Sequence, residues 1–332
     1  MSFPFNVYAL AFIAALISSA LSFPLWRRFC VRTGHVDDPG HRKIHSDPVP
    51  LAGGLTVMTG FFLPVLVGAG VIVAWRHGDV QILVRDLFEY GLSQRALQLM
   101  AVLGGGFGMV LLGWWDDKHE LRPLSKFSGQ ILIALLVAWS GIKITVFIPS
   151  GLVAYALTVL WILALTNALN FLDNMNGLCT GLGFVAAWGC AWAGAIQGQY
   201  LVATLAFLIC GALLGFLPFN FPDARAFLGD AGSHLVGFLV AVLAILPNFY
   251  SAETPHRSAV LSPLLILAIP IYDLVSVVII RWRNGQPFYV GDTNHISHRL
   301  TRRGLSRSRA VLTILLVQAL LTAVALVLLP RV

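Results

Sequence analysis

Two adjacent carboxylates, Asp116 and Asp117, end an apolar stretch in LLGWWDDKHELRPLSK, residues 111–126. They repel each other, and a divalent cation beside them makes their proximity favourable. Mg²⁺ commonly binds one or two protein carboxylates together with substrate phosphates. One aspartate could then hold the ion while its neighbour acts as a base. The structural alternative is an acidic pair at a helix end that is held by basic residues, namely Lys118, Arg122 and Lys126.

The segment NALNFLDNMNGL, residues 167–178, places five amide or acidic side chains in apolar surroundings: Asn167, Asn170, Asp173, Asn174 and Asn176. Spacings of three and seven residues bring several of them to one flank of a helix. Amides donate and accept hydrogen bonds, which suits the edge of a nucleobase or a sugar. The alternative is a polar seam between transmembrane helices, but this cluster is larger than one seam needs.

A third acid, Asp230, lies in a Gly-Asp-Ala-Gly-Ser turn that begins another apolar stretch. A carboxylate in this position can cap a helix N-terminus. A glycine-rich helix start is also a phosphate cradle. The turn therefore permits both a structural and a phosphate-binding interpretation.

The segment 291–309 combines histidines with arginines. His295 and His298 are three residues apart, and Arg299 follows directly. These groups suit the recognition of a phosphate or diphosphate. A basic loop at the membrane surface is the alternative.

The composition indicates a polytopic membrane protein, because 58% of the 332 residues are hydrophobic and only 11% are charged, against about a quarter in an average soluble domain. A crossing needs roughly 20 apolar residues. We predict an all-α fold with about ten transmembrane helices, forming a single integral-membrane domain over 1–332. The first stretch lacks signal-peptide features, so a retained helix is expected. The predicted spans are 4–25, 51–75, 97–115, 127–142, 151–168, 178–196, 199–217, 231–248, 260–280 and 309–330.

The basic residues are distributed unevenly over the predicted loops. Of the 22 lysines and arginines, 16 fall on one side of the membrane and 6 on the other. The side richer in basic residues is expected to be cytoplasmic, which places both termini outside and Asp116, Asp117, Asp173 and Asp230 inside. The net charge of +7 is then mostly a membrane-surface feature, and no nucleic-acid partner is expected.

Three other features have simpler explanations. The GGGFG stretch at 104–108 lies within a predicted span with no strand before it, so it predicts close helix packing and not a dinucleotide site. Asp273 is the only acid well inside a span, which makes it a functional candidate or a support for the basic loop. The four cysteines show no metal-ligand spacing and are expected to be small core residues.

Five segments in a fixed order resemble the polyprenyl-phosphate N-acetylhexosamine-1-phosphate transferases (glycosyltransferase family 4). This family includes the peptidoglycan translocase and the enzymes that start enterobacterial common antigen, O-antigen and teichoic acid synthesis. The Arg-Lys-x-His and His-x-x-His-Arg-Leu stretches are similar to the branch of the latter enzymes. The segments are RKIHSDPVPLAGG at 42–54, WWDDKHELRPLSKFSGQ at 114–130, NALNFLDNMNGL at 167–178, FLGDAGS at 227–233 and PFYVGDTNHISHRL at 287–300.

The resemblance implies roles for the matching positions. It makes Asp116, Asp117 and Asp230 catalytic, with Asp230 as the principal metal ligand. The implied metal site also includes Asp117 and Asp173, and it holds Mg²⁺, with Mn²⁺ as the alternative ion. The implied substrate-binding residues, with Phe227 stacking on uracil, are Asn170, Asp173, Asn176, Asn220, Phe227, Lys43, His45, His295, His298 and Arg299.

Three positions depart from the family's pattern. The family usually has Asp-Gly-x-Asp-Gly, whereas this chain has Asp-Asn-Met-Asn-Gly at 173–177, so Asn174 replaces a glycine and Asn176 replaces an acid. Ser297 stands where a middle histidine is common. These departures concern the nucleotide contacts and the choice of sugar, and they leave the three acids intact.

We therefore expect the transfer of an N-acetylhexosamine 1-phosphate, GlcNAc 1-phosphate first, from a UDP-sugar to polyprenyl phosphate with release of UMP. Direct attack by the lipid phosphate with help from Asp116 is favoured, and a covalent phospho-aspartate stays open. The alternatives are the pentapeptide-sugar translocase and, in another class, a secondary transporter. The expected location is the bacterial inner membrane with a cytoplasmic active site, and a homodimer stays open.

Overall fold

The computed structural model describes residues 3–38, 47–75, 83–145, 150–247, 257–287 and 292–329. Within these ranges the chain is almost entirely helical, with one two-stranded antiparallel sheet. The elements are α1 (Phe5–Thr33), β1 (Val36–Asp37), β2 (Val49–Pro50), α2 (Gly53–Trp75), α3 (Leu83–His119), α4 (Pro123–Trp139), α5 (Gly151–Phe171), α6 (Leu178–Ile196), α7 (Tyr200–Asn220), α8 (Gly229–Leu243), the 3₁₀ helix η1 (Arg257–Leu261), α9 (Ser262–Ile266), α10 (Ala268–Arg283), α11 (Ile296–Arg302) and α12 (Arg307–Val327).

Each of the ten predicted spans corresponds to a helix or to a pair of helices. Seven helices in the described ranges are long and apolar enough to cross a membrane, and α9 with α10, bent by 68°, allows an eighth. The helices α4 and α8 are apolar but have only 17 and 15 residues, about 26 and about 23 Å at ~1.5 Å per residue. The prediction of a polytopic, all-α membrane protein is confirmed, with seven or eight of the ten predicted spans long enough to cross by length and composition and two that are shorter apolar helices.

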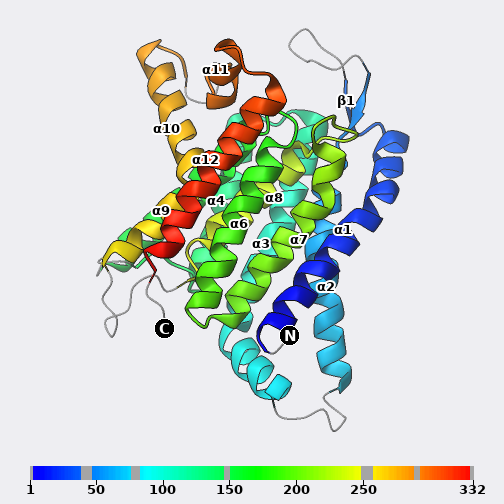
Figure 1. Cartoon of the computed structure of the whole chain (residues 1–332), viewed down its shortest axis with the longest axis vertical. Helices are drawn as coiled ribbons and strands as arrows, with labels where there is room; N and C mark the ends of the chain where they lie inside the picture. The colour runs from blue at the N-terminus through cyan, green and yellow to red at the C-terminus, as the bar shows by residue number, and fades with distance from the viewer. Residues whose placement is uncertain are drawn as a thin grey trace.

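The two ends of the bundle differ. Figure 1 shows both termini at one end and the small sheet with α11 at the other. The helices α3, α5 and α7 finish at the end of the bundle that carries α11, and α4, α6 and α8 begin there. This end therefore gathers the helix termini that carry the polar residues singled out in the sequence.

The helix α8 lies at the centre of the bundle, since every residue from Gly229 to Leu243 except Asp230 is buried. Two glycines let neighbouring helices approach it closely. A Cβ on Gly113 of α3 would collide with the backbone of Asp230, and a Cβ on Gly237 of α8 would lie 2.6 Å from Thr166 Cα in α5. These approaches bring the polar ends of α3 and α5 to the start of α8.

Two minor sequence predictions are confirmed. A Cβ on Gly105, in the GGGFG stretch, would lie 2.6 Å from the ring of Phe238, so this stretch packs α3 on α8. The four cysteines are free and buried, as expected for small residues of the core.

Candidate active site

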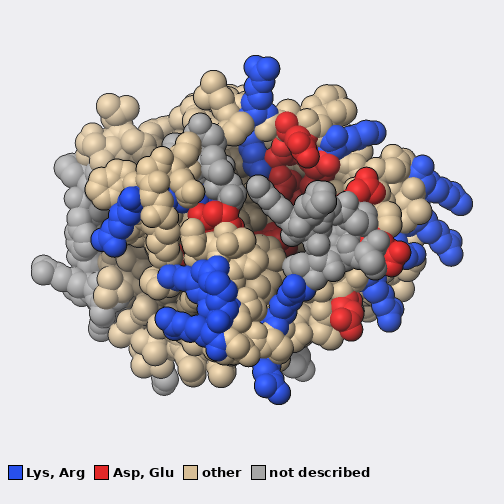
Figure 2. Space-filling model, turned by 90° about the horizontal axis from the view of Figure 1, so that it is seen from above, with Lys and Arg blue, Asp and Glu red and all other residues tan. Residues whose placement is uncertain are grey.

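A cleft of about 1020 Å³ opens at the end of the bundle that carries α11. Figure 2 shows this end, with acidic side chains near the centre of the view and most lysines and arginines toward its edge. The predicted site residues that line the cleft are Asp116, Asp117, Asn170, Asp173, Asn176, Asn220, Phe227 and Asp230. The tertiary structure therefore brings eight predicted residues from four separate segments into one cavity.

Lys126 of α4 joins two of the predicted catalytic acids. Its ammonium group lies 2.7 Å from Asp116 Oδ2 and 2.9 Å from Asp230 Oδ2. The other oxygens are also engaged: Asp116 Oδ1 accepts the Leu121 N–H at 2.8 Å, and Asp230 Oδ1 accepts from Asn170 Nδ2 at 2.7 Å. A basic residue thus holds one member of the acidic pair, and the same residue links it to α8.

Asp117 has different partners from Asp116. Its carboxylate accepts the backbone N–H groups of Asp230 at 2.7 Å and Ala231 at 3.1 Å, which are unsatisfied donors at the start of α8. His35 Nε2 lies 3.9 Å away. The capping role considered for Asp230 therefore belongs to Asp117, and Asp230 is left to face Lys126 and Asn170.

A chain of polar side chains descends from the cleft between α4, α5 and α8. Asn167 Nδ2 donates to Gln130 Oε1 at 2.7 Å, and Gln130 Nε2 lies 3.4 Å from His234 Nε2. Asn170 also donates to Ser233 Oγ at 2.9 Å. The seam interpretation of 167–178 is thus correct for Asn167, whereas Asn170 reaches the acids of the cleft.

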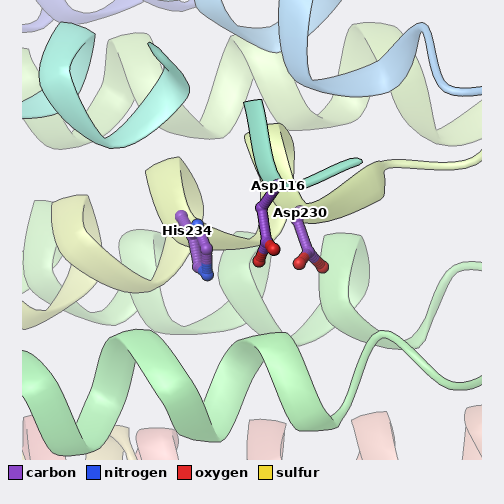
Figure 3. Close-up of side chains that lie close together, drawn as sticks. All are labelled: Asp116, Asp230 and His234. Carbon is purple, nitrogen blue, oxygen red and sulfur yellow. The ribbon is translucent and has the colours of Figure 1, made fainter. Parts of the chain in front are cut away.

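Three side chains are placed to hold a metal ion. Ligand atoms of Asp116, Asp230 and His234 all lie within 4.8 Å of one another, and Figure 3 shows the three side chains extending in the same direction. Two carboxylates and one imidazole form a donor set that suits a divalent cation. Within the described ranges this group includes neither Asp117 nor Asp173, whose predicted metal roles stay predictions.

Asp173 lies in the loop after α5 and lines the same cleft. Burial raises the pKa of this carboxyl group well above its usual value, and the charges of Asp230 and Asp117 raise it further. A cation or a phosphate-bound ion in the cleft would favour the ionised form. Asp173 is therefore a carboxyl group whose charge state responds to whatever occupies the cleft.

The predicted nucleotide residues lie around the loop that connects α7 with α8. Asn220 is buried, and its Oδ1 accepts from the Gly177 N–H at 3.0 Å and from Thr180 Oγ1 at 2.8 Å. Asn176 Nδ2 donates to Pro222 O at 3.0 Å. Phe227 lines the cleft and is fixed by its backbone, since its N–H donates to Pro50 O at 3.0 Å. Both asparagines thus also shape the wall of the cleft.

The histidine segment is anchored by Asp273 of α10. Asp273 Oδ2 lies 2.7 Å from His295 Nδ1, and Oδ1 accepts the Ile296 N–H at 2.7 Å. Asp273 therefore supports the basic loop, the second of the two roles considered for it. Arg299 reaches Tyr272 and Ser276 on α10, each at 3.4 Å.

Some predicted residues do not join the cleft. In the part of the chain that the structure describes, His295, His298 and Arg299 are not among the residues that line it. Burial lowers the pKa of His298, and the neighbouring charges of His295, Arg302 and Arg307 lower it further. Lys43 and His45 lie outside the described residues.

The motifs indicate Lys126 only as a basic residue that could hold the acidic pair, and they do not point to Gln130 or His234, which lie behind the acids. Lys126 and Gln130 are four residues apart on α4, as are Asp230 and His234 on α8. On a helix this spacing places both members of a pair on one face. The signals present in the sequence are the four-residue spacing of Lys126 and Gln130 in KFSGQ and the histidine that directly follows GDAGS.

The sequence profile of glycosyl transferase family 4 matches residues 99–248. The chain is 32% identical, over 326 residues, to a protein of Bacillus subtilis (strain 168) named "Probable undecaprenyl-phosphate N-acetylglucosaminyl 1-phosphate transferase", with 96% of this chain and 84% of the relative aligned. The chain belongs to glycosyl transferase family 4. It is an integral-membrane transferase, and the family predicted from the five motifs is confirmed.

Two further relatives align with most of the chain. A decaprenyl-phosphate N-acetylglucosaminephosphotransferase of Mycobacterium tuberculosis (strain ATCC 25618 / H37Rv) is 33% identical over 335 residues, with 91% of this chain and 78% of the relative aligned. An undecaprenyl-phosphate alpha-N-acetylglucosaminyl 1-phosphate transferase of Escherichia coli (strain K12) is 29% identical, with 90% and 77% aligned. The family profile covers Asp116, Asp173 and Asp230.

Proposed function

We propose that this protein transfers N-acetylglucosamine 1-phosphate from a UDP-sugar to a polyprenyl phosphate and releases UMP. The observation that carries the proposal is the contact of Lys126 with Asp116 and Asp230 at the open end of a bundle of apolar helices. Charged groups that can bind phosphates thus lie where a soluble donor can meet a lipid acceptor. The names of three relatives support GlcNAc 1-phosphate and a polyprenyl phosphate as the substrates.

The donor would occupy the cleft with its uracil beside Phe227. An aromatic ring offers a stacking surface for a base, and Asn176 lies at the same wall, with Nδ2 directed at Pro222 O. The diphosphate would then extend toward Lys126 and Asn170, whose Nζ and Nδ2 groups are donors. This orientation leaves the acids beside the bond that is to break.

A divalent ion held by Asp116 and Asp230 would neutralise the charge that develops on the diphosphate oxygens. The ammonium of Lys126 contributes a second, fixed positive charge that can follow the phosphates. Asp117 holds the start of α8 through two backbone N–H groups. It thereby fixes the position of Asp230, and it lines the cleft beside it.

In the favoured reaction, an oxygen of the lipid phosphate attacks the phosphorus atom that carries the sugar. The bond between this phosphorus and the oxygen of the UMP phosphate breaks, and UMP leaves. Asp116 would accept the proton of a monoprotonated lipid phosphate on the carboxylate oxygen that does not hold the ion. A covalent route would instead place the sugar phosphate on an aspartate before the lipid attacks, and trapping of a phosphorylated enzyme in the absence of lipid distinguishes the two.

We further propose that the cleft faces the cytoplasm of a bacterial inner membrane. The uneven distribution of lysine and arginine supports this orientation. Figure 2 agrees with it, because basic side chains surround the face that opens into the cleft. A UDP-sugar made in the cytoplasm would then reach the site directly.

The test uses purified full-length protein in detergent with undecaprenyl phosphate and Mg²⁺. UDP-GlcNAc, UDP-GalNAc and the pentapeptide-bearing UDP-sugar are supplied separately, and UMP and lipid-linked product are measured. We expect lipid-dependent UMP release, fastest with UDP-GlcNAc. Fastest release with the pentapeptide donor would assign the translocase reaction. Uptake of UDP-sugar into proteoliposomes without UMP release would assign transport and overturn the proposal.

A further inference from the structure

A buried histidine lies directly beneath the two acids that Lys126 joins. His234 is fully buried, one helical turn after Asp230 on α8. A ring nitrogen lies within 4.8 Å of a carboxylate oxygen of both Asp116 and Asp230. Figure 3 shows the imidazole beside the carboxylate of Asp116, with Asp230 on the other side.

The hydrogen bonds of His234 are incomplete. Its Nδ1 has no hydrogen-bond partner among the described residues. Its Nε2 lies 3.4 Å from Gln130 Nε2, which is longer than a typical hydrogen bond. Since Gln130 Oε1 is taken by Asn167, this amide presents only N–H to the ring. A buried polar group with so few partners is unfavourable unless an ion, a ligand or an ordered water contacts it.

The two carboxylates retain capacity for a cation. An ionised carboxylate has about four acceptor positions. Each of these two accepts from Lys126 and from one other donor, and the two carboxyl groups also contact each other. An ion can therefore bind carboxylate oxygens of Asp116 and Asp230 from the side where the imidazole lies. The contact from Gln130 is long enough to be displaced.

We propose that His234 supplies a nitrogen ligand to the divalent ion at Asp116 and Asp230, and that the site therefore favours Mn²⁺ over Mg²⁺. The proposal rests on the proposed function only in that the ion would serve the same transfer reaction. Mg²⁺ prefers oxygen ligands throughout. Mn²⁺ also prefers oxygen and is the weakest binder of the first-row series, but it accepts a single imidazole more readily than Mg²⁺ does. A mixed set of two carboxylates and one imidazole shifts the preference toward the transition ion.

The decisive measurement is electron spin-echo envelope modulation on the full-length protein loaded with Mn²⁺ alone. No substrate is present, so the result does not depend on turnover. We expect a coupling from directly bound ¹⁴N, which changes to the ¹⁵N pattern when the protein is grown with ¹⁵N-histidine. Absence of a nitrogen coupling, or of a saturable Mn²⁺ site, would overturn the inference while leaving lipid-dependent UMP release as a separate question.

Variants assign the nitrogen to one residue. His234→Leu should remove the nitrogen coupling and lower the affinity ratio of Mn²⁺ to Mg²⁺ at least ~10-fold, the lower end of the losses seen when a metal site is perturbed. His35→Gln is the matched control, because His35 lies 3.9 Å from Asp117, and it should keep the coupling. Should His234→Leu fold poorly, the ¹⁵N-histidine spectrum of the unchanged protein still shows that a histidine binds the ion, and an unchanged coupling in His35→Gln excludes the histidine beside Asp117. A coupling that persists in folded His234→Leu protein would refute the assignment.

Discussion

The hydroxyl group of Ser297 donates a 2.7 Å hydrogen bond to Asn174 Oδ1. This contact joins α11 to the loop between α5 and α6, 123 positions earlier in the chain. Ser297 and Asn174 are also two of the positions at which the chain departs from the family's usual histidine and glycine. The two departures therefore belong together, as one contact between the histidine segment and the nucleotide loop.

This contact predicts that the two positions are energetically coupled. Ser297→Ala and Asn174→Ala should each lower thermal stability. The double variant should lose about 0.5–1.5 kcal/mol less than the sum of the single losses, since the partly buried hydrogen bond is removed only once. Thermal unfolding in detergent measures the stability of the unchanged protein, the two single variants and the double variant. Strictly additive losses would show that the contact contributes nothing to the fold.

Neutralising either acid joined by Lys126 should stop catalysis without unfolding the protein. Asp230→Asn and Asp116→Asn keep the size of the side chain and remove the charge that faces Lys126 and the proposed ion. We expect turnover to fall at least ~100-fold, the scale of losing a charge-stabilising group. Rates of UMP release are measured on protein whose gel-filtration profile is unchanged. Near-normal turnover of folded Asp230→Asn protein would exclude its catalytic role.

Lys126 should affect metal binding and turnover in opposite directions. Lys126→Met removes the cation that contacts both carboxylates, so a divalent ion meets less competition and should bind more tightly. Turnover should nevertheless fall by about 100-fold, because the phosphates lose a fixed charge. Isothermal titration with Mn²⁺ and UMP-release rates separate the two effects. Lys126→Arg is the control that keeps the charge but changes its geometry; weaker Mn²⁺ binding by Lys126→Met would contradict this account.

Phe227 should matter to the nucleotide and not to the lipid. Stacking of a base on an aromatic ring is worth roughly 1–3 kcal/mol. Because ~1.4 kcal/mol corresponds to a tenfold change in affinity, Phe227→Ala should weaken UDP-sugar binding by about 5- to 150-fold. Titrating each substrate separately checks this. Asn176→Asp restores the residue that is commoner in the family and should stay active. Equal weakening for both substrates would mean that Phe227 only packs the start of α8.

The orientation can be tested at Arg303, which is exposed just after α11. In protein whose four native cysteines are replaced, Arg303→Cys should react with a membrane-impermeant thiol reagent only after the cells are opened. The reason is the concentration of basic residues on this side. Labelling at this position in intact cells would reverse the proposed topology.

Much of the fold could be predicted from hydropathy, because a chain in a bilayer must satisfy its backbone hydrogen bonds within each helix. That constraint acts locally, and all ten predicted stretches became helices or helix pairs. The gathering of Asp116, Asp173 and Asp230 at one end was predictable for the same reason. Their positions at the ends of apolar stretches already determine the end of the bundle at which they lie.

The roles of the individual acids depended on tertiary structure. Asp116 and Asp117 are neighbours in sequence, yet one faces Lys126 and the other caps α8. Successive residues on a helix point about 100° apart, so their partners depend on how neighbouring helices are rotated and how closely they approach. The close approach of α3 to α8 at Gly113 sets that geometry. No local sequence pattern predicts this approach.

The tertiary structure also determined which residues the histidines contact. His295 and His298 are prominent in the sequence because they share a motif with arginines, but Asp273 holds His295 against α10. His234 stood in an apolar stretch and drew no attention, although it lies beside the acids. A local sequence pattern determines which residues share a helix face. Which of those faces meet depends on packing among α3, α4, α5 and α8, because contacts between distant segments form only in the folded bundle.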